Sequence, residues 1–256
     1  MSGTRVLITG ASSGIGAALA REYVRRDARV GLVARRAGTL ARLADELRGR
    51  CTFYPADVRD AAGMRQVAAR FIAEHGGADV VIANAGVSAG TLTEHFEDHA
   101  VFREIMDINV LGMVHTFSPF LPAMRAAGAG TLVGIASVAG IRGLPGAGAY
   151  SASKSAAITY LESLRVECHG SGVRVLTIAP GYIATPMTAA NPYRMPFIVP
   201  ADTAALRMAD VIEQGRAYTV IPWQMGVVAL GLRALPRWLH DRLFARAKRK
   251  PRRVPG

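Results

Sequence analysis

Short runs rich in β-branched residues alternate with longer segments of helical composition along nearly the whole chain. Seven runs have the length of strands: residues 5–10, 29–34, 51–57, 79–86, 130–137, 173–180 and 217–222. Between them lie segments rich in Ala, Leu and Arg, such as AGTLARLADELRG. Strands that alternate with helices usually pair in parallel, and the helices then cover both faces of the sheet. The alternation therefore predicts a doubly wound α/β fold with a seven-stranded parallel sheet.

A chain of 256 residues can bury the core of one large α/β domain, and no linker or low-complexity block interrupts the series. We therefore expect one domain over residues 1–222 and an apolar, then basic, extension over residues 223–256. Cys51 and Cys168 form no metal-type or CxxC cluster, so no metal site is expected. Nothing indicates a disulfide framework, and the short apolar start does not read as a signal peptide. A cytoplasmic protein is the expectation.

The first turn of the series, TGASSGIG at residues 9–16, carries Gly10, Gly14 and Gly16 between a strand and a helix. Glycine there lets the backbone approach a pyrophosphate, and the helix N-terminus offers free N–H groups to the phosphates. The spacing is GxxxGxG and not the GxGxxG of the general dinucleotide fingerprint. A tight turn without a ligand is the alternative, but the surrounding alternation favours a dinucleotide site.

Two arginines follow the second predicted strand. Arg35 lies nineteen residues after Gly16, Arg36 comes next, and no carboxylate is near. An acidic residue at this distance binds the ribose 2′-hydroxyl of NAD, whereas arginine accommodates the 2′-phosphate of NADP. A solvated pair of arginines is the alternative in so arginine-rich a chain. The pair favours NADP(H) as cofactor.

Lys154 is one of only three lysines in a chain that has twenty-eight arginines. It follows Tyr150 by four residues in a run of small, helix-tolerant residues, so both side chains project from one helix face. A nearby ammonium and an oxidised nicotinamide ring would favour the phenolate and lower the pKa of the tyrosine. A compact ammonium can also reach ribose hydroxyls, which a planar guanidinium does less well.

Together these motifs resemble the classical short-chain dehydrogenase/reductase family, of the NADP-preferring type. The matching pieces, in the family's order over about residues 4–222, are TGASSGIG, ADV (56–58), ANAG (83–86), Asn109, Ser137, YSASK (150–154) and PGYIAT (180–185). The resemblance implies a single Rossmann-type domain and an oxidoreductase that transfers hydride between NADP(H) and a carbonyl or secondary alcohol. It also implies a homo-oligomer, either a dimer or a tetramer.

The resemblance assigns roles residue by residue. Tyr150 would be the general acid in reduction and the base in oxidation, and Lys154 would lower its pKa and hold the nicotinamide ribose. Ser137 would orient the substrate oxygen, and Asn109 would hold a water that links Lys154 to solvent. The implied cofactor contacts are Gly10, Ser12, Ser13, Gly14, Ile15, Gly16, Arg35, Arg36, Asp57, Val58, Asn84, Ala85, Gly86, Tyr150, Lys154, Pro180, Gly181, Ile183 and Thr185.

Some of these residues could instead have a purely structural role. Tyr150 could be a packed helical tyrosine, and Asn109 could be an amide on a helix surface. His115 is expected on a helix face without a catalytic role.

The stretch from residue 182 to residue 200 departs from the family pattern, because it holds a single charge, Arg194, among Met, Phe and Tyr residues. An apolar segment after the sixth strand points to a lid over a bulky apolar substrate. Packing on a partner subunit or on the protein's own core is the alternative.

The C-terminal extension departs further. No charge occurs over residues 217–232, but this stretch is too short and too broken for a transmembrane helix. After Pro236, arginines line one helix face and an apolar set lines another: Leu235, Trp238, Leu239, Leu243 and Ala247. A basic amphipathic helix of this kind predicts peripheral membrane contact. Packing on its own subunit or a dimer contact, with the last basic residues solvated, is the alternative.

The net charge of +12 is concentrated in this extension. Residues 233–256 hold nine basic residues against one acidic residue, whereas residues 1–232 hold twenty-two against eighteen. Nucleic acid is not expected as a partner, because no broad face interleaves aromatic and basic residues. The second functional hypothesis is an NADP-binding peripheral membrane or sensing protein with little turnover, which the intact Ser137, Tyr150 and Lys154 disfavour.

Overall fold

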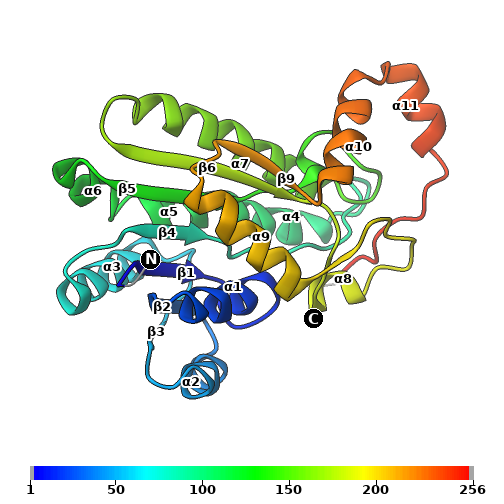
Figure 1. Ribbon diagram of the computed structural model, residues 1–256. Coiled ribbons are helices and arrows are strands. Elements are labelled where there is room, and N and C mark those ends of the chain that lie inside the picture. Colours follow the sequence, from blue (N-terminus) through cyan, green and yellow to red (C-terminus); the bar gives the residue numbers. More distant parts are fainter. Residues whose placement is uncertain (1–2, 254–256) are drawn as a thin grey trace.

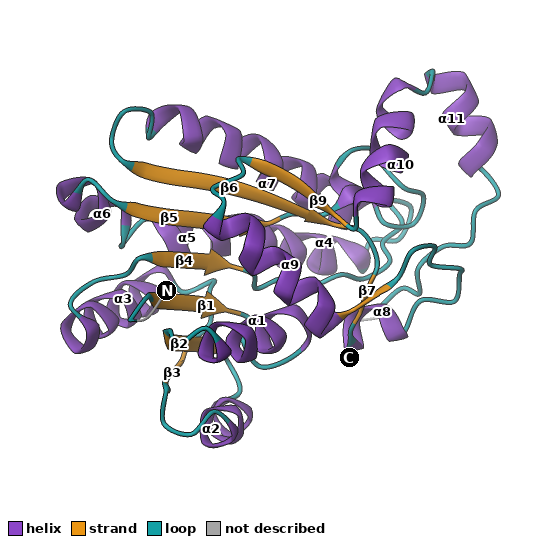
Figure 2. Ribbon diagram, viewed as in Figure 1, coloured by secondary structure: helices purple, strands orange, loops and turns teal. Residues whose placement is uncertain are grey.

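The computed structural model describes residues 3–253 and shows a parallel sheet between two layers of helices (Figures 1 and 2). Within these residues seven parallel strands form the main sheet, in the order β3-β2-β1-β4-β5-β6-β9. The strands are β1 (Arg5–Thr9), β2 (Arg29–Ala34), β3 (Cys51–Pro55), β4 (Val80–Ala83), β5 (Gly130–Ile135), β6 (Val173–Pro180) and β9 (Tyr218–Ile221). The predicted seven-stranded parallel sheet is confirmed.

Helices cover both faces because the strands carry apolar side chains on both. In β1, Val6 and Ile8 belong to one buried cluster and Leu7 belongs to the other. The first cluster packs under α1 (Gly14–Arg25), α2 (Ala37–Glu46) and α9 (Ala201–Glu213). The second cluster packs under α3 (Ala61–His75), α5 (Gly112–Phe117), α6 (Leu121–Ala127) and α7 (Gly148–Glu167). Figure 2 shows α1 and α9 in front of the sheet and α7 behind it.

The chain reverses its direction across the sheet between β1 and β4. Strands β2 and β3 extend to one side of β1, and β4, β5, β6 and β9 extend to the other. The loops that leave the carboxyl ends of β1 and β4 therefore diverge and open a crevice, which is where ligands bind in sheets of this type. Several predicted strands ran past the observed ends, because their last residues, such as Asn84 and Ser137, form the loops at this crevice.

The apolar segment after β6 is more ordered than a plain lid. Strand β7 (Ile183–Ala184) pairs with β8 (Val199–Pro200) in a second, two-stranded sheet, and the short helix α8 (Pro186–Ala189) lies between them. Ile183 and Val199 join the buried core, whereas Phe197 and Ile198 are exposed. The alternative of packing on the protein's own core therefore holds for Ile183 and Val199, and the lid over an apolar substrate stays a prediction.

Two helices follow β9 and stand at the end of the sheet in Figure 1. Helix α10 (Trp223–Ala234) buries Met225 and Ala229 against the 3-10 turn η2 (Val138–Gly140). Helix α11 (Arg237–Phe244) lies farther out, and none of its residues is buried. Own-subunit packing therefore holds for one face of α10 and not for α11. No helix in the described part of the chain is long and apolar enough to cross a membrane.

The residues after α11 return to the body. The Gly90 N–H donates a 2.9 Å hydrogen bond to the carbonyl oxygen of Pro251, and Arg252 donates two hydrogen bonds, 2.8 and 3.0 Å long, to the buried carboxylate of Asp98. Asp98 begins helix α4 (Asp98–Met106). We call residues 250–253 the C-terminal strap; residues 254–256 of the predicted extension lie outside the described residues.

Two further contacts fix the strap. The Lys250 Nζ donates to Ser88 Oγ at 2.8 Å, and Arg253 forms an ion pair with Glu104. The alternative that the last basic residues are merely solvated is therefore wrong for Lys250, Arg252 and Arg253.

Candidate active site

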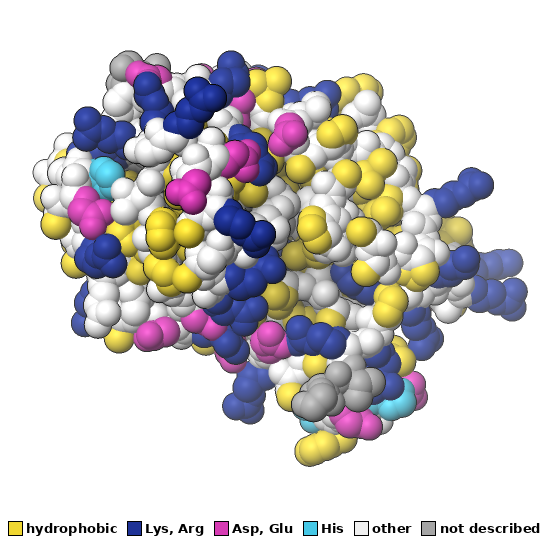
Figure 3. All heavy atoms as spheres, turned by 90° about the horizontal axis from the view of Figure 1, so that it is seen from below, with side chains coloured by type: hydrophobic (Ala, Val, Ile, Leu, Met, Phe, Trp, Pro, Cys, Tyr) yellow, Lys and Arg dark blue, Asp and Glu magenta, His cyan; other side chains and the backbone are white. Residues whose placement is uncertain are grey.

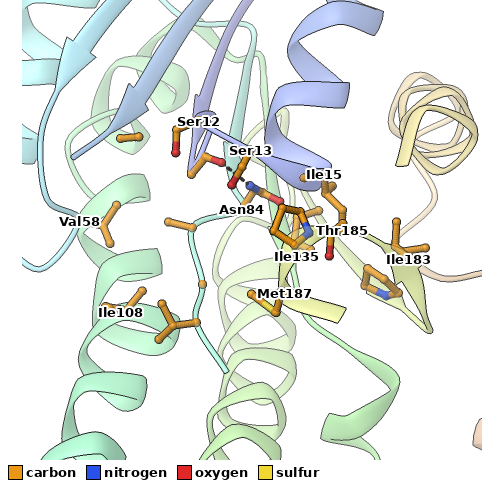
Figure 4. A pocket seen from close by; sticks show the side chains of 18 of the residues that line it. Ser12, Ser13, Ile15, Val58, Asn84, Ile108, Ile135, Ile183, Thr185 and Met187 are labelled. Carbon is orange, nitrogen blue, oxygen red and sulfur yellow. Dashed lines mark hydrogen bonds between the residues drawn. The ribbon is translucent and has the colours of Figure 1, made fainter. Parts of the chain in front are cut away.

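A cleft of ≈ 320 Å³ lies at the carboxyl ends of β1, β4, β5 and β6, at the crevice where the sheet reverses. In Figure 4, Val58 and Ile108 stand on one side of the cleft and Ile183, Thr185 and Met187 on the other, with Ser12, Ser13 and Asn84 near its head. The predicted site residues that line it are Gly10, Ser12, Ser13, Gly14, Ile15, Arg35, Arg36, Asp57, Val58, Asn84, Ala85, Gly86, Ser137, Tyr150, Lys154, Pro180, Gly181, Ile183 and Thr185. Gly16 and Asn109 are not among the residues that line it.

The glycine turn packs too closely for side chains. Gly10 has a φ of 66°, and a Cβ on it would lie 2.8 Å from the Ala85 Cα. A Cβ on Gly16 would lie 2.3 Å from the Gly10 carbonyl oxygen, so Gly16 supports the turn from behind the cleft. The Asn84 amide donates to the Thr9 and Gly10 carbonyl oxygens at 3.0 and 3.3 Å. Asn84 therefore holds the turn as well as lining the cleft.

Helix α1 begins at Gly14 and points its N-terminus at the cleft. Its N-cap residue, Ser13, has extended backbone and makes no side-chain capping hydrogen bond, and its first turn holds no acidic residue. An N-terminus of this kind presents backbone N–H groups and a positive dipole end to an anion. This end of the cleft is therefore suited to a pyrophosphate.

Arg35 and Arg36 follow β2 and lie at the far end of the cleft from Ser137, Tyr150 and Lys154. Both are exposed, and the Arg36 guanidinium donates to Ser12 Oγ at 3.2 Å. Beyond the end of β3, the Asp57 carboxylate is paired with Arg59 at 2.6 Å, and this hydrogen bond lowers the pKa of Asp57. In the lower view of the molecule, dark-blue basic side chains gather along a hollowed, largely apolar strip (Figure 3).

Ser137, Tyr150 and Lys154 meet at the opposite end of the cleft. Ser137 lies just beyond the end of β5, directly before the turn η2. Its hydroxyl accepts a 3.1 Å hydrogen bond from the Ala139 N–H and donates a longer one, 3.4 Å, to the Pro180 carbonyl oxygen. Tyr150 and Lys154 lie one turn apart on α7, with the ammonium 5.9 Å from the centre of the tyrosine ring. Lys154 Nζ donates to the Ile135 carbonyl oxygen at 2.7 Å.

Burial dominates the electrostatics of this group. Burial raises the pKa of Tyr150, and a hydrogen bond with Ser137 only partly opposes it. Burial also lowers the pKa of Lys154 to about 8. The lowering of the Tyr150 pKa that we expected from Lys154 is therefore not seen among the protein's own groups. The physical reason is that desolvation penalises the phenolate, while the ammonium is directed to the Ile135 carbonyl oxygen.

Asn109 lies in a π-helical turn, η1 (Asp107–Leu111), and is 1% exposed. Its Oδ1 accepts from the Val87 N–H at 2.8 Å, and its Nδ2 donates to the Val87 carbonyl oxygen and to Ser153 Oγ. The alternative of a helix-surface amide is wrong. A Cβ on Gly86 would lie 3.2 Å from Asn109 Oδ1 and 3.6 Å from Lys154 Nζ, so both polar groups approach the backbone at Gly86.

Some residues at the site carried no signal in the sequence. His115 donates from Nδ1 to the Val58 carbonyl oxygen at 2.9 Å and so holds a cleft residue fifty-seven positions away. Val87, Ile108 and Met187 line the cleft as ordinary apolar residues. Only the sheet order brings them together, so a local pattern could not have identified them.

The residues of the cleft fit a dinucleotide. The glycine turn leaves room where Cβ atoms would stand, the α1 N-terminus suits a pyrophosphate, and a Ser–Tyr–Lys group lies at the other end. Among residues 3–253, no group of three or more His, Cys, Asp or Glu side chains could hold a metal ion. Fold and site together define a nucleotide-binding α/β oxidoreductase.

Comparison with known proteins specifies the family. The family model for short-chain dehydrogenases matches residues 4–194. An uncharacterised oxidoreductase of Myxococcus xanthus is 41% identical over 244 residues, which covers 94% of this chain and 96% of the relative. The chain belongs to the short-chain dehydrogenase/reductase family, whose members interconvert alcohols and carbonyls with NAD(P).

Solved structures agree in fold and differ in bound cofactor. An alcohol dehydrogenase from the archaeon Thermococcus sibiricus, complexed with 5-hydroxy-NADP, is 26% identical with a TM-score of 0.77, and the match covers 85% of this chain and 95% of that one. A short-chain dehydrogenase from Burkholderia phymatum, in complex with NAD, has a TM-score of 0.82 at 24% identity, and the match covers 100% of this chain and 98% of that one.

Proposed function

We propose that this protein is an NADPH-dependent reductase of apolar ketones, or the matching alcohol dehydrogenase in the reverse direction. The proposal rests on one observation: a single cleft has two different groups of side chains at its two ends. Ser137, Tyr150 and Lys154 lie at one end, and Arg35 and Arg36 lie at the other.

The arginines support NADP over NAD. Two adjacent guanidiniums offer several hydrogen-bond donors and two positive charges to a phosphate dianion. Arg36 already reaches across to Ser12 of the glycine turn, which places its guanidinium beside the phosphate end of the cleft. No carboxylate follows β2 to bind a ribose 2′-hydroxyl.

The catalytic end supports reduction. Bound NADPH would supply the hydride, and the protein must supply a proton and orientation. The raised pKa of Tyr150 keeps its phenol protonated near neutral pH, so the phenol can donate its proton to the substrate oxygen. The hydrogen bond that Ser137 Oγ donates to the Pro180 carbonyl oxygen is long, at 3.4 Å, so the hydroxyl can turn its proton to the substrate oxygen as well.

Lys154 and Asn109 would complete the proton path. A lysine with a pKa of about 8 can exchange a proton near the pH at which the enzyme works. Asn109 Oδ1 and Lys154 Nζ both approach Gly86, which supports a bridging water between them and solvent. An apolar substrate is favoured by Val87, Ile183 and Met187 in the cleft.

The cofactor assignment is tested by the affinities for NADPH and NADH. We expect NADPH to bind more tightly by over about tenfold, because each charged hydrogen bond lost is worth roughly 1.5–3 kcal/mol. Arg35→Asp combined with Arg36→Ala should reverse the preference. Arg42→Ala is the matched control, since this exposed arginine bonds, among residues 3–253, only to the Gly38 carbonyl oxygen of its own helix. Equal affinities of the unmodified protein for the two cofactors would refute NADP preference.

The chemistry is tested by NADPH oxidation against a panel of cyclic, aromatic and long-chain ketones. Tyr150→Phe should abolish turnover and leave NADPH affinity nearly unchanged, because the ring still packs but carries no proton. Tyr160→Phe, on the same helix but outside the cleft, is the control and should keep wild-type activity. If Tyr150→Phe retains a third of the wild-type rate, the mechanism is wrong. NADPH binding without turnover of any ketone would favour the sensing hypothesis.

A further inference from the structure

Helix α10 is apolar on two opposite faces. Met225 and Ala229 are buried against the body of the protein. On the other side, Trp223, Val227 and Leu230 follow one another at i, i+4 and i+7 and form a stripe. Trp223 is 71% exposed, Val227 60% and Leu230 70%. The body of the protein therefore covers one face and leaves the other in contact with solvent.

Helix α11 continues this apolar surface and adds positive charge. Trp238 and Leu243 are 67% and 59% exposed. Six cations lie on the two helices or in the residues that follow α11: Arg233, Arg237, Arg242, Arg246, Lys248 and Arg249. None of the six forms an ion pair with any residue between positions 3 and 253. We call the hairpin surface these six cations together with the exposed apolar residues Trp223, Val227, Leu230, Trp238 and Leu243.

The basic residues of the C-terminal extension differ in whether they have partners on the body of the protein. Arg252 and Arg253 have carboxylate partners on the body, and Lys250 has Ser88. The six cations of the hairpin surface have no carboxylate partner in the described part of the chain. The protein thus compensates the charges that hold the strap and leaves the charges around the exposed tryptophans available to an external anion.

We propose that the hairpin surface binds an anionic lipid bilayer in the interfacial plane. Tryptophan side chains favour the boundary between headgroups and acyl chains, where the ring is buried and the N–H stays hydrated. Leu230, Val227 and Leu243 would enter the same depth, as in other interfacial helices. The arginines would lie among the headgroup phosphates, and each basic residue near an anionic surface adds to the attraction.

Charge distribution argues against a second copy of the chain as the occupant. A two-fold interface places the same patch against itself, so the six cations would face the same six cations of the partner. Like charges held together at an interface are unfavourable. Duplex DNA would compensate the cations but would leave Trp223, Leu230 and Trp238 exposed, since its phosphate backbone offers no apolar layer.

The test measures co-sedimentation of the full-length protein, without substrate, with phospholipid vesicles. Vesicles of phosphatidylglycerol and phosphatidylcholine in equal parts should bind it, and vesicles of phosphatidylcholine alone should bind it at least about tenfold more weakly, because several cationic contacts are lost. Binding should fall as the salt concentration rises from about 0.1 M to about 0.5 M. Vesicle binding is measured without turnover, so its result does not depend on whether the reductase proposal is correct.

A triple variant separates insertion from attraction of charge. Trp223→Ser, Leu230→Ser and Trp238→Ser together keep every cation and remove only exposed side chains. We expect at least about a tenfold loss of vesicle binding, because burying one such side chain is already worth a tenfold step in affinity. The matched control is Phe96→Ser with Val166→Ser, which are 82% and 63% exposed outside the hairpin surface and should bind vesicles as the wild type does.

Three outcomes would overturn the proposal. The first is wild-type binding by the triple variant, which would mean that only charge attracts the protein. The second is no binding of the unmodified protein to phosphatidylglycerol vesicles. The third is an unmodified dimer that ignores vesicles and that the triple variant converts to monomers, which would assign the surface to a second copy. If the triple variant unfolds, Arg237→Gln with Arg242→Gln and Arg246→Gln decides instead, and unchanged binding would again overturn the proposal.

Discussion

Replacing Lys154 by methionine should abolish turnover and remove a specific pH dependence of stability. Burial lowers the pKa of this lysine from 10.5 to about 8. One pKa unit corresponds to about 1.4 kcal/mol, so keeping the ammonium in the folded protein near pH 7 costs about 3 kcal/mol. Methionine fills a similar volume without charge and avoids this cost.

The sign follows from which state holds the proton more tightly. Between the two pKa values the unfolded chain binds the Lys154 proton and the folded protein does not, so the wild-type free energy of unfolding rises as the pH rises from about 8 towards 10.5. Below about pH 8 the full cost is present. The methionine variant lacks this rise, so its stability relative to the wild type should fall by about 2.5 kcal/mol between about pH 7 and about pH 10.

The test compares how the free energy of unfolding changes with pH, and not its value at one pH. The reason is that the substitution also removes a hydrogen bond, which opposes the gain in stability. The variant loses the 2.7 Å hydrogen bond to the Ile135 carbonyl oxygen, and an unpaired buried carbonyl costs roughly 1–3 kcal/mol. That loss is the same at every pH. Urea unfolding followed by far-ultraviolet circular dichroism, without added cofactor, measures the free energy of unfolding of both proteins. Lys248→Met, an exposed site, should follow the wild-type profile. If the free energies of unfolding of Lys154→Met and the wild type change with pH in parallel, burial does not lower the pKa of Lys154 as argued.

Three further predictions concern single side chains. Lys154→Arg should lose most of kcat although it keeps the charge, because a planar guanidinium does not fit the buried position of the ammonium; full activity would contradict the argument from shape. Gly16→Ala should reduce NADPH affinity and thermal stability, since its Cβ would lie 2.3 Å from a backbone oxygen of the same turn, whereas Gly38→Ala meets nothing within 4 Å and is the control. Arg252→Gln should release the strap from the Asp98 carboxylate and speed trypsin cleavage near the C-terminus; an unchanged cleavage rate would show that this ion pair does not hold it.

The strand pattern predicted the fold because it depends on local chemistry. Each strand of a doubly wound sheet must be apolar on both faces, so runs such as residues 29–34 and 173–180 are recognisable without any partner. The alternation with helices then restricts the topology to a parallel sheet with a reversal. The small sheet of β7 and β8 was missed, since two-residue strands leave no periodic pattern.

The close spacing of site residues was equally predictable. Gly10 and Gly16 belong to one turn, and Tyr150 and Lys154 belong to one helical turn, so the sequence alone brings each pair together. Their meeting with Ser137 follows from the strand order, which the alternation also implies. The sequence did not predict the raised pKa of Tyr150, because burial depends on packing from distant segments.

The C-terminal extension shows most clearly which features the sequence determines and which depend on the tertiary structure. The sequence by itself determined an apolar stretch followed by a basic amphipathic helix, because composition and helical period are local properties. Only the tertiary structure decided which cations are compensated. Arg252 meets Asp98 across 154 residues, whereas Arg237 and Arg242 on α11 have no acidic partner among residues 3–253. Ion pairs depend on where the chain returns in space, and that position is set by the packing of α10 on the sheet.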